Sequence, residues 1–90
     1  MPQPRKPGGN LAHIAHLLHH IRLYAGVLES SLAHTTGTDI SYVRDILAGR
    51  RFPSRTFTTR YARVCGADPL VLLMVWQDEH DRRQRHHPRF

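Results

Sequence analysis

One stretch of the chain contains five arginines and no acidic residue. The arginines are Arg50, Arg51, Arg55, Arg60 and Arg63. A guanidinium group can hold two oxygens of one phosphate through parallel N–H donors. The hydroxyl groups of Thr56, Thr58 and Thr59 can add hydrogen bonds to the same ligand. We predict that four residues contact the sugar-phosphate backbone of a nucleic acid: Arg50, Arg51, Arg55 and Thr56. Arg60 and Arg63 are expected to contribute less. The alternative is a basic face that meets only water.

Four histidines lie close together near the start of the chain: His13, His16, His19 and His20. Steps of three and four residues are also used by metal-binding helices, but no Cys, Asp or Glu lies near to complete a tetrahedral ligand set. We therefore expect solvent-facing histidines, with no metal and no cofactor. A histidine-based metal or pH sensor is the weakest of three hypotheses for the function.

Cys65 is the single cysteine, which excludes an intramolecular disulfide and a multi-cysteine zinc site. Beside Gly66, at a helix end, it is expected to be a small buried apolar residue rather than a reactive thiol. No nucleophile–base–acid set, phosphate-binding loop or carboxylate pair is found. We expect no catalytic residues and no enzyme.

Length and charge restrict the class of protein further. Ninety residues form one small domain, and thirteen basic against seven acidic residues give a net charge of +6. The longest apolar run, Leu70 to Trp76, is too short to span a membrane, and the first ten residues lack the apolar segment of a signal peptide. We predict a basic, cytoplasmic protein that makes no membrane contact.

Apolar residues recur at steps of three and four, which predicts an all-α domain over residues 10–84. It lies between a disordered tail (1–9) and a basic tail (85–90). Residues expected to begin helices are Asn10, Asp39, Ser54 and Asp68, and the expected helix ends are Gly26, Gly37, Gly49 and Gly66. The five predicted helices cover about 10–25, 29–36, 40–48, 55–65 and 69–83, the last fraying among its arginines.

The second and third predicted helices carry the spacing of a helix-turn-helix. Ala33 is small where two helices must cross closely, and Gly37 suits the left-handed turn between them. Val43 and Ile46 would then hold the third helix against the second. The opposite face of the third helix is left free to enter a DNA major groove.

The surrounding residues extend this pattern from Leu18 to Trp76. The matching positions are L18-x-x-I21-R22-x-x-x-G26-V27, L32-A33-x-x-x-G37, V43-x-x-I46-x-x-G49-R50-R51-x-P53-S54 and R63-V-C-G-A-D-P69. The chain thus resembles the Xre/Cro-type helix-turn-helix family, in particular its short arginine-rich actinobacterial members. The resemblance implies a five-helix, lambda-repressor-like domain that binds double-stranded DNA as a dimer in transcriptional control, associated with the nucleoid when bound.

The resemblance also places Ile40, Ser41, Arg44 and Asp45 on the surface that faces the bases. Arg44 would donate two hydrogen bonds to a guanine edge, and Asp45 would accept one from cytosine N4. Ile40 would pack on a thymine methyl group. The alternative is that Arg44 and Asp45 are simply solvated and that Ile40 is a half-buried residue at a helix start.

Three positions depart from the family pattern. Leu28 stands where a capping Ser or Thr is usual, and Glu29 places a carboxylate where the family meets a phosphate. Leu47 leaves Arg22 without its usual acidic partner. Together with Asp39 and Asp45, Glu29 supports the alternative function of a protein-interaction module with weak or lost DNA binding.

The fifth helix begins with seven consecutive apolar residues, so two turns are apolar all round. The other helices can cover only one side of it. We expect an exposed apolar side that includes Leu72, Val75 and Trp76 and that pairs two chains into a homodimer. The alternatives are that the arginine-rich tail or another protein covers it.

Overall fold

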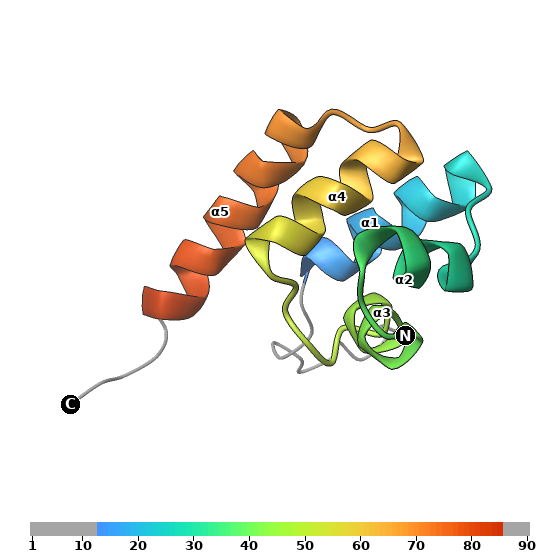
Figure 1. The fold of residues 1–90 in the computed structure, drawn as a ribbon. Coiled ribbons are helices and arrows are strands. Elements are labelled where there is room, and N and C mark those ends of the chain that lie inside the picture. Colours follow the sequence, from blue (N-terminus) through green and yellow to red (C-terminus); the bar gives the residue numbers. More distant parts are fainter. Residues whose placement is uncertain (1–12, 86–90) are drawn as a thin grey trace, which may run out of the picture.

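The structure, a computed structural model, describes residues 13–85, and within this range it contains helices and no strand. The helices are α1 (His13–Ala25), α2 (Glu29–Thr36), α3 (Ile40–Leu47), α4 (Arg55–Cys65) and α5 (Pro69–Arg85) (Figure 1). The predicted all-α, five-helix fold is confirmed. The predictions for Asn10 and for the two tails lie outside the described residues, apart from Arg85, which is helical.

Two predicted helix ends were wrong. The third helix stops at Leu47, and Ala48 is its capping residue, so it is one residue shorter than predicted. The fifth helix does not fray before Arg85. Its last turns carry two ion pairs four residues apart, Asp78–Arg82 at 3.2 Å and Glu79–Arg83 at 3.6 Å, a spacing that supports a helix.

Capping side chains explain where the last two helices begin. The Ser54 hydroxyl accepts a hydrogen bond from the Phe57 N–H at 3.0 Å, and the Asp68 carboxylate accepts one from the Leu70 N–H at 2.9 Å. Asp39 stands at the capping position of α3 without making such a bond. Gly37 adopts φ = +74°, the left-handed conformation that glycine tolerates best, and so ends α2 in a tight turn.

Helix α4 packs against α1, α2 and α5 and so lies at the centre of the fold (Figure 1). Its Phe57 and Tyr61 point into a core that the other helices complete with Ile14, Leu18, Leu32, Val43, Ile46 and Leu72. The Tyr61 hydroxyl donates a hydrogen bond to the Leu18 carbonyl at 2.6 Å. This bond joins α4 to α1 inside the core.

The expected exposure of Leu72 and Trp76 was wrong. Leu72 is 2% and Trp76 9% exposed, because both face inward from α5, one turn apart. The loop before α4 covers Trp76: its indole N–H donates to the Pro53 carbonyl at 2.9 Å, and its ring stacks on Phe52 at 5.7 Å between centroids. Trp76 is thus covered by a loop as well as by helices, and helical periodicity in the sequence does not predict contacts made by a loop.

A buried carboxylate joins the last helix, α5, to the start of the first helix, α1. Glu79 of α5 is 5% exposed, and its two oxygens accept hydrogen bonds from the backbone N–H groups of His13 (2.9 Å) and Ile14 (2.8 Å). A negative charge at the start of a helix also interacts favourably with the helix dipole. None of the described helices has the length and apolar character that crossing a membrane requires.

Candidate nucleic-acid interface

Helices α2 and α3 form the predicted helix-turn-helix. Leu32 and Ala33 of α2 and Val43 and Ile46 of α3 are all buried in the core. There α2 packs against α3 and α4, and α3 also packs against α1. Arg60 supports the turn from α4, since its guanidinium donates to the Thr36 carbonyl at 3.1 Å. The inner face of α3 is therefore fixed, and its outer face is free to bind.

The four residues predicted to face DNA bases lie together on the outer part of α3. Ser41 and Arg44 are exposed, whereas Ile40 and Asp45 are half-buried. Ile40 and Ser41 form the start of the helix, the part that enters a groove first in a helix-turn-helix. The described geometry brings these residues together without showing a base contact.

Arg44 forms an ion pair with Glu29, the first residue of α2. Its Nε donates to the Glu29 carboxylate at 3.2 Å, and the two side chains are 60% and 33% exposed. The sequence presents Glu29 as a charge that opposes DNA, and this pair was not predicted. The fifteen-residue separation gives no helical spacing by which to detect it.

Asp45 and Arg50, predicted to contact a base and a phosphate respectively, instead bind each other here. Both Nε (3.2 Å) and Nη2 (2.7 Å) of Arg50 donate to the same oxygen of Asp45. The side chains remain 64% and 38% exposed, so the pair lies at the surface. Contact with DNA would require Arg50 to exchange this carboxylate for a phosphate.

The remaining phosphate candidates surround the end of α3. Arg51 lies over the ring of Tyr42, with its guanidinium carbon 5.2 Å from the ring centroid. The Tyr42 hydroxyl in turn accepts a hydrogen bond from the Ser54 N–H at 3.1 Å. Arg55 and Thr56 are exposed on the first turn of α4. Arg51, Arg55 and Thr56 are thus free to meet a ligand.

Two secondary candidates have other roles. Thr58 is completely buried, and its hydroxyl donates to the Ser54 carbonyl, so the expected phosphate contact from Thr58 was wrong. Arg60 is engaged with the end of α2, as described above. In the sequence, both look like members of the basic stretch, because neither helix packing nor the position of the α2 carbonyls can be read from it.

The departures at Leu28 and Arg22 have visible consequences. Leu28 occupies the capping position of α2 and makes no capping side-chain hydrogen bond. Arg22 donates from Nη1 to the Val27 carbonyl at 3.0 Å, while its buried Nε has no hydrogen-bond partner among the described residues. The missing acidic partner of Arg22 is therefore only partly replaced.

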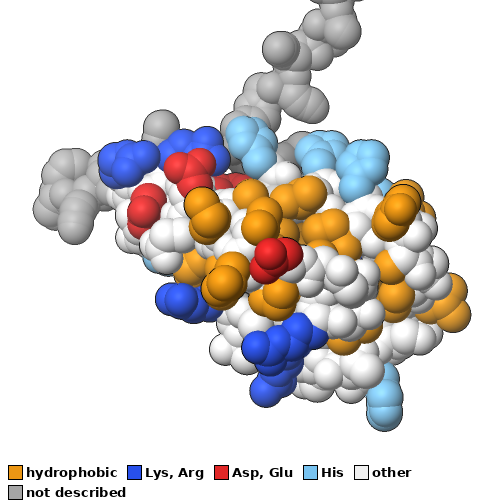
Figure 2. Space-filling view, turned by 90° about the horizontal axis from the view of Figure 1, so that it is seen from above, with side chains coloured by type: hydrophobic (Ala, Val, Ile, Leu, Met, Phe, Trp, Pro, Cys, Tyr) orange, Lys and Arg blue, Asp and Glu red, His pale blue; other side chains and the backbone are white. Residues whose placement is uncertain are grey.

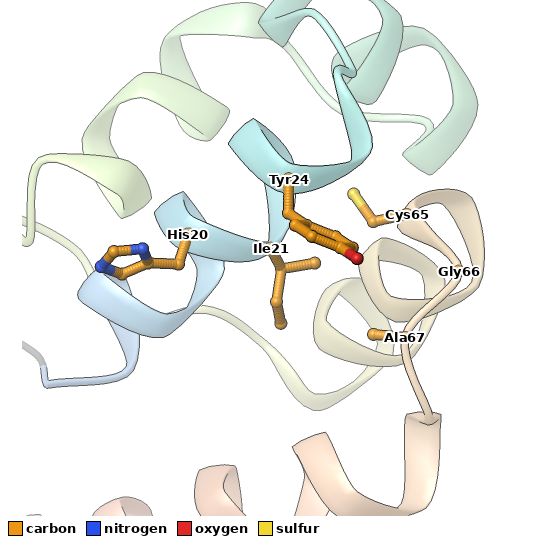
Figure 3. A pocket seen from close by; sticks show the side chains of 6 residues that line it. All are labelled: His20, Ile21, Tyr24, Cys65, Gly66 and Ala67. Atoms are coloured by element: carbon orange, nitrogen blue, oxygen red, sulfur yellow. The ribbon is translucent and has the colours of Figure 1, made fainter.

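His13, His16, His19 and His20 are all exposed on α1, as predicted. Within residues 13–85, no three metal-binding side chains of the His, Cys, Asp or Glu type come together. His20 and Cys65 line an open pocket of about 480 Å³ between α1 and the turn that joins α4 to α5 (Figure 3). Cys65 is half-buried there, and burial raises the pKa of its thiol above the ordinary value.

A second surface is apolar. Four side chains on the first half of α5 are exposed, and we call them the α5 apolar face: Leu70, Val71, Met74 and Val75. Tyr24 of α1, which lines the pocket beside Cys65, is 96% exposed (Figure 3). Seen from above the fold, apolar side chains spread over much of the surface with few charges between them (Figure 2).

Comparisons with known proteins give two findings. A family model described as a helix-turn-helix domain matches residues 13–73. The fold is similar to the crystal structure of the restriction-modification controller protein C.AhdI from Aeromonas hydrophila, with a TM-score of 0.63 and 26% sequence identity. That similarity covers 72% of this chain and 98% of the other. No curated protein sequence gives a significant match.

Proposed function

The chain belongs to the Xre-type helix-turn-helix family of DNA-binding regulators, and we propose that it controls transcription by binding one DNA sequence with α3 in the major groove. One observation carries the proposal: the free outer face of α3 lies beside the exposed arginines Arg51 and Arg55. A helix that reads bases needs such flanking cations to hold the DNA backbone.

The individual contacts follow from the chemistry of the side chains on this surface, of which Ser41 and Arg44 are exposed and Ile40 and Asp45 are half-buried. Arg44 donates to a guanine edge, Ser41 bonds a neighbouring base, and Ile40 packs on a thymine methyl group. Asp45 accepts from cytosine only after Arg50 has moved from its carboxylate to a phosphate. Arg51, Arg55 and Thr56 bind phosphates on either side of the groove.

The similar solved structure supports the regulatory part of the proposal. C.AhdI is a controller protein of a restriction-modification system. We propose that this chain likewise acts as a controller, by occupying an operator-like site.

Selection of binding sites from a random duplex library tests the proposal. Wild-type protein is expected to enrich one motif, and Arg44→Ala is expected to relax preference at one base pair, by about 1–3 kcal/mol. Arg85→Ala is the matched control, because Arg85 is an exposed arginine on the last turn of α5 and is not among the predicted DNA contacts. No enriched motif, or equal effects of the two variants, would refute sequence-specific recognition.

We propose further that two chains pair through the α5 apolar face. Leu70 and Met74 are 73% and 72% exposed, and monomeric proteins rarely leave such neighbouring apolar side chains in water. Of the residues predicted for this interface, only Val75 is exposed. A two-fold pair would present two α3 helices to half-sites about 34 Å apart.

Sedimentation at micromolar concentration tests the pairing. The wild type is expected at twice the 10.4 kDa of one chain. Met74→Glu is expected to sediment as a folded monomer, whereas Gln77→Glu, at an exposed polar position of the same helix, is expected to stay paired. A wild-type monomer would contradict the pairing and leave the DNA-binding proposal standing.

A protein-interaction module remains the second candidate. The observation in its favour is that Glu29 and Asp45 each neutralise an arginine on the proposed DNA surface. Its signature in the selection experiment is a folded protein that enriches no motif. Wild-type binding to a defined duplex would exclude it as the principal function.

A further inference from the structure

The Glu29–Arg44 pair joins the start of α2 to the outer face of α3 by a single hydrogen bond. Only Nε of Arg44 contacts the carboxylate, at 3.2 Å. The two terminal nitrogens, Nη1 and Nη2, make no hydrogen bond to any residue between 13 and 85. They are the end of a side chain that is 60% exposed.

This arrangement leaves free the donors that guanine requires. An arginine reads guanine through two N–H groups directed at O6 and N7. Nη1 and Nη2 form such a pair when Nε is already held. A free arginine side chain on a helix surface would lose several rotamers on binding, whereas one held at Nε has lost part of that freedom beforehand.

The second ion pair on this surface shows a different geometry. Arg50 uses both Nε and Nη2 on one oxygen of Asp45, so its planar fork is occupied by the protein itself. Glu29 thus holds its arginine without filling the fork, and Asp45 fills it. Glu29 therefore leaves its arginine able to bind a further ligand through Nη1 and Nη2, whereas Asp45 competes with a ligand for Nε and Nη2 of Arg50.

We propose that Glu29 is a positioning residue that holds Arg44 ready to bind a guanine in the major groove; this inference rests on the proposed function. Glu29 has a second effect, because its negative charge at the start of α2 repels the phosphates of any DNA. It therefore weakens binding to all sequences and strengthens preference for one. These two effects can be measured separately.

The experiment uses the duplex selected by the full-length wild-type protein and three variants of it, which carry the other three base pairs at the position where Arg44→Ala loses preference. Glu29→Ala is expected to lower the preference for guanine at that same position by about five-fold or more, out of the roughly five- to 150-fold that one bidentate contact provides. It is also expected to raise affinity for a scrambled duplex.

Asp39→Ala is the matched control. Asp39 is an exposed acid directly before α3, and the described residues include no ion pair to it. Its removal is expected to raise affinity for every duplex and leave the base preference unchanged. Glu29→Gln keeps an oxygen that accepts from Nε, and so is expected to retain most of the preference while losing the charge.

A double variant completes the test. Adding Glu29→Ala to Arg44→Ala is expected to change base preference no further. Unchanged preference in Glu29→Ala, or equal loss in Glu29→Gln and Glu29→Ala, would overturn the positioning role. If Arg44→Ala itself alters no base preference, the proposed base contact fails before Glu29 is considered, which distinguishes the two failures.

Discussion

The proposed DNA surface and the junction of α1, α4 and α5 both contain polar groups, but they use them in opposite ways. At the junction, polar side chains are buried and bind backbone groups of another element: Glu79 on α1, Trp76 on the loop before α4, and Tyr61 on α1. On the proposed DNA surface, Arg44 of α3 and Arg50 of the loop that follows it are exposed and bind carboxylates that water also reaches.

This difference predicts different consequences of substitution. A buried polar group that loses its partner costs the full free energy of its desolvation, whereas an exposed ion pair contributes little to stability. Substitutions at the junction should therefore lower the free energy of unfolding, and substitutions on α3 should change DNA binding alone.

The largest effect is expected at Trp76. Trp76→Ala should lower the free energy of unfolding by about 3–5 kcal/mol, because it removes a buried ring and its stacking on Phe52. Urea denaturation followed by circular dichroism measures this, with Gln77→Ala as the exposed neighbouring control. A loss below about 1 kcal/mol would show that the loop before α4 does not depend on the ring.

Glu79 offers the next test. Glu79→Ala should cost about 1.5–3 kcal/mol, because the backbone N–H groups of His13 and Ile14 lose a charged acceptor. Glu79→Gln should cost less, since its single carbonyl oxygen can still accept. Asp81→Ala, at an exposed acid of the same helix, should be nearly neutral. Equal melting curves for Glu79→Ala and Asp81→Ala would show that the buried carboxylate contributes no more to stability than the exposed one.

On the proposed DNA surface, Arg51→Gln combined with Arg55→Gln should leave stability almost unchanged. The double variant should weaken binding to all duplexes alike and flatten the plot of log affinity against log salt by nearly two units, about 0.9 for each phosphate that is no longer bound. Fluorescence anisotropy at salt concentrations from about 50 to 200 mM provides the measurement, with Arg85→Gln, at an exposed arginine on the last turn of α5, as the control. Identical slopes for the double variant and the wild type would contradict both phosphate contacts.

The smallest effect is expected at Tyr61 and depends on pH. Burial raises the pKa of Tyr61 well above its ordinary value near 10, so the folded chain binds the phenol proton more tightly than the unfolded chain. Stability should then be unaffected at neutral pH and should fall as pH rises above about 10. Tyr61→Phe removes the hydrogen bond to Leu18 and should lower the free energy of unfolding by about 1 kcal/mol at neutral pH. Because the variant has no phenol to ionise, its free energy of unfolding should then decrease less than that of the wild type when the pH is raised to about 10.5. An equal alkaline loss in both proteins would refute this linkage.

Much of the fold was determined by local features of the sequence. Apolar spacing located the five helices, and Ser54, Asp68 and Gly37 located ends of three of them, because a cap or a left-handed turn depends only on near neighbours. The resemblance to a known family identified the helix-turn-helix and the outer face of α3, where Ser41 and Arg44 are exposed. Such features can be predicted from the sequence because they depend on residues within about one helical turn, or on a residue spacing that the family shares.

Associations between distant segments were decided by the tertiary structure alone. Trp76 and Leu72 were expected at the surface, because a run of apolar residues does not show which side of α5 faces the core. Nor does it show that the loop before α4 covers Trp76. Glu79 lies 65 residues from Ile14 in the chain, and nothing in the composition of either helix predicts their hydrogen bond. The pairing of Arg44 with Glu29 likewise depends on how α2 and α3 cross. From the sequence, Glu29 is expected only to repel DNA. In the folded chain it is also the ion-pair partner of Arg44, the arginine proposed to bind a base.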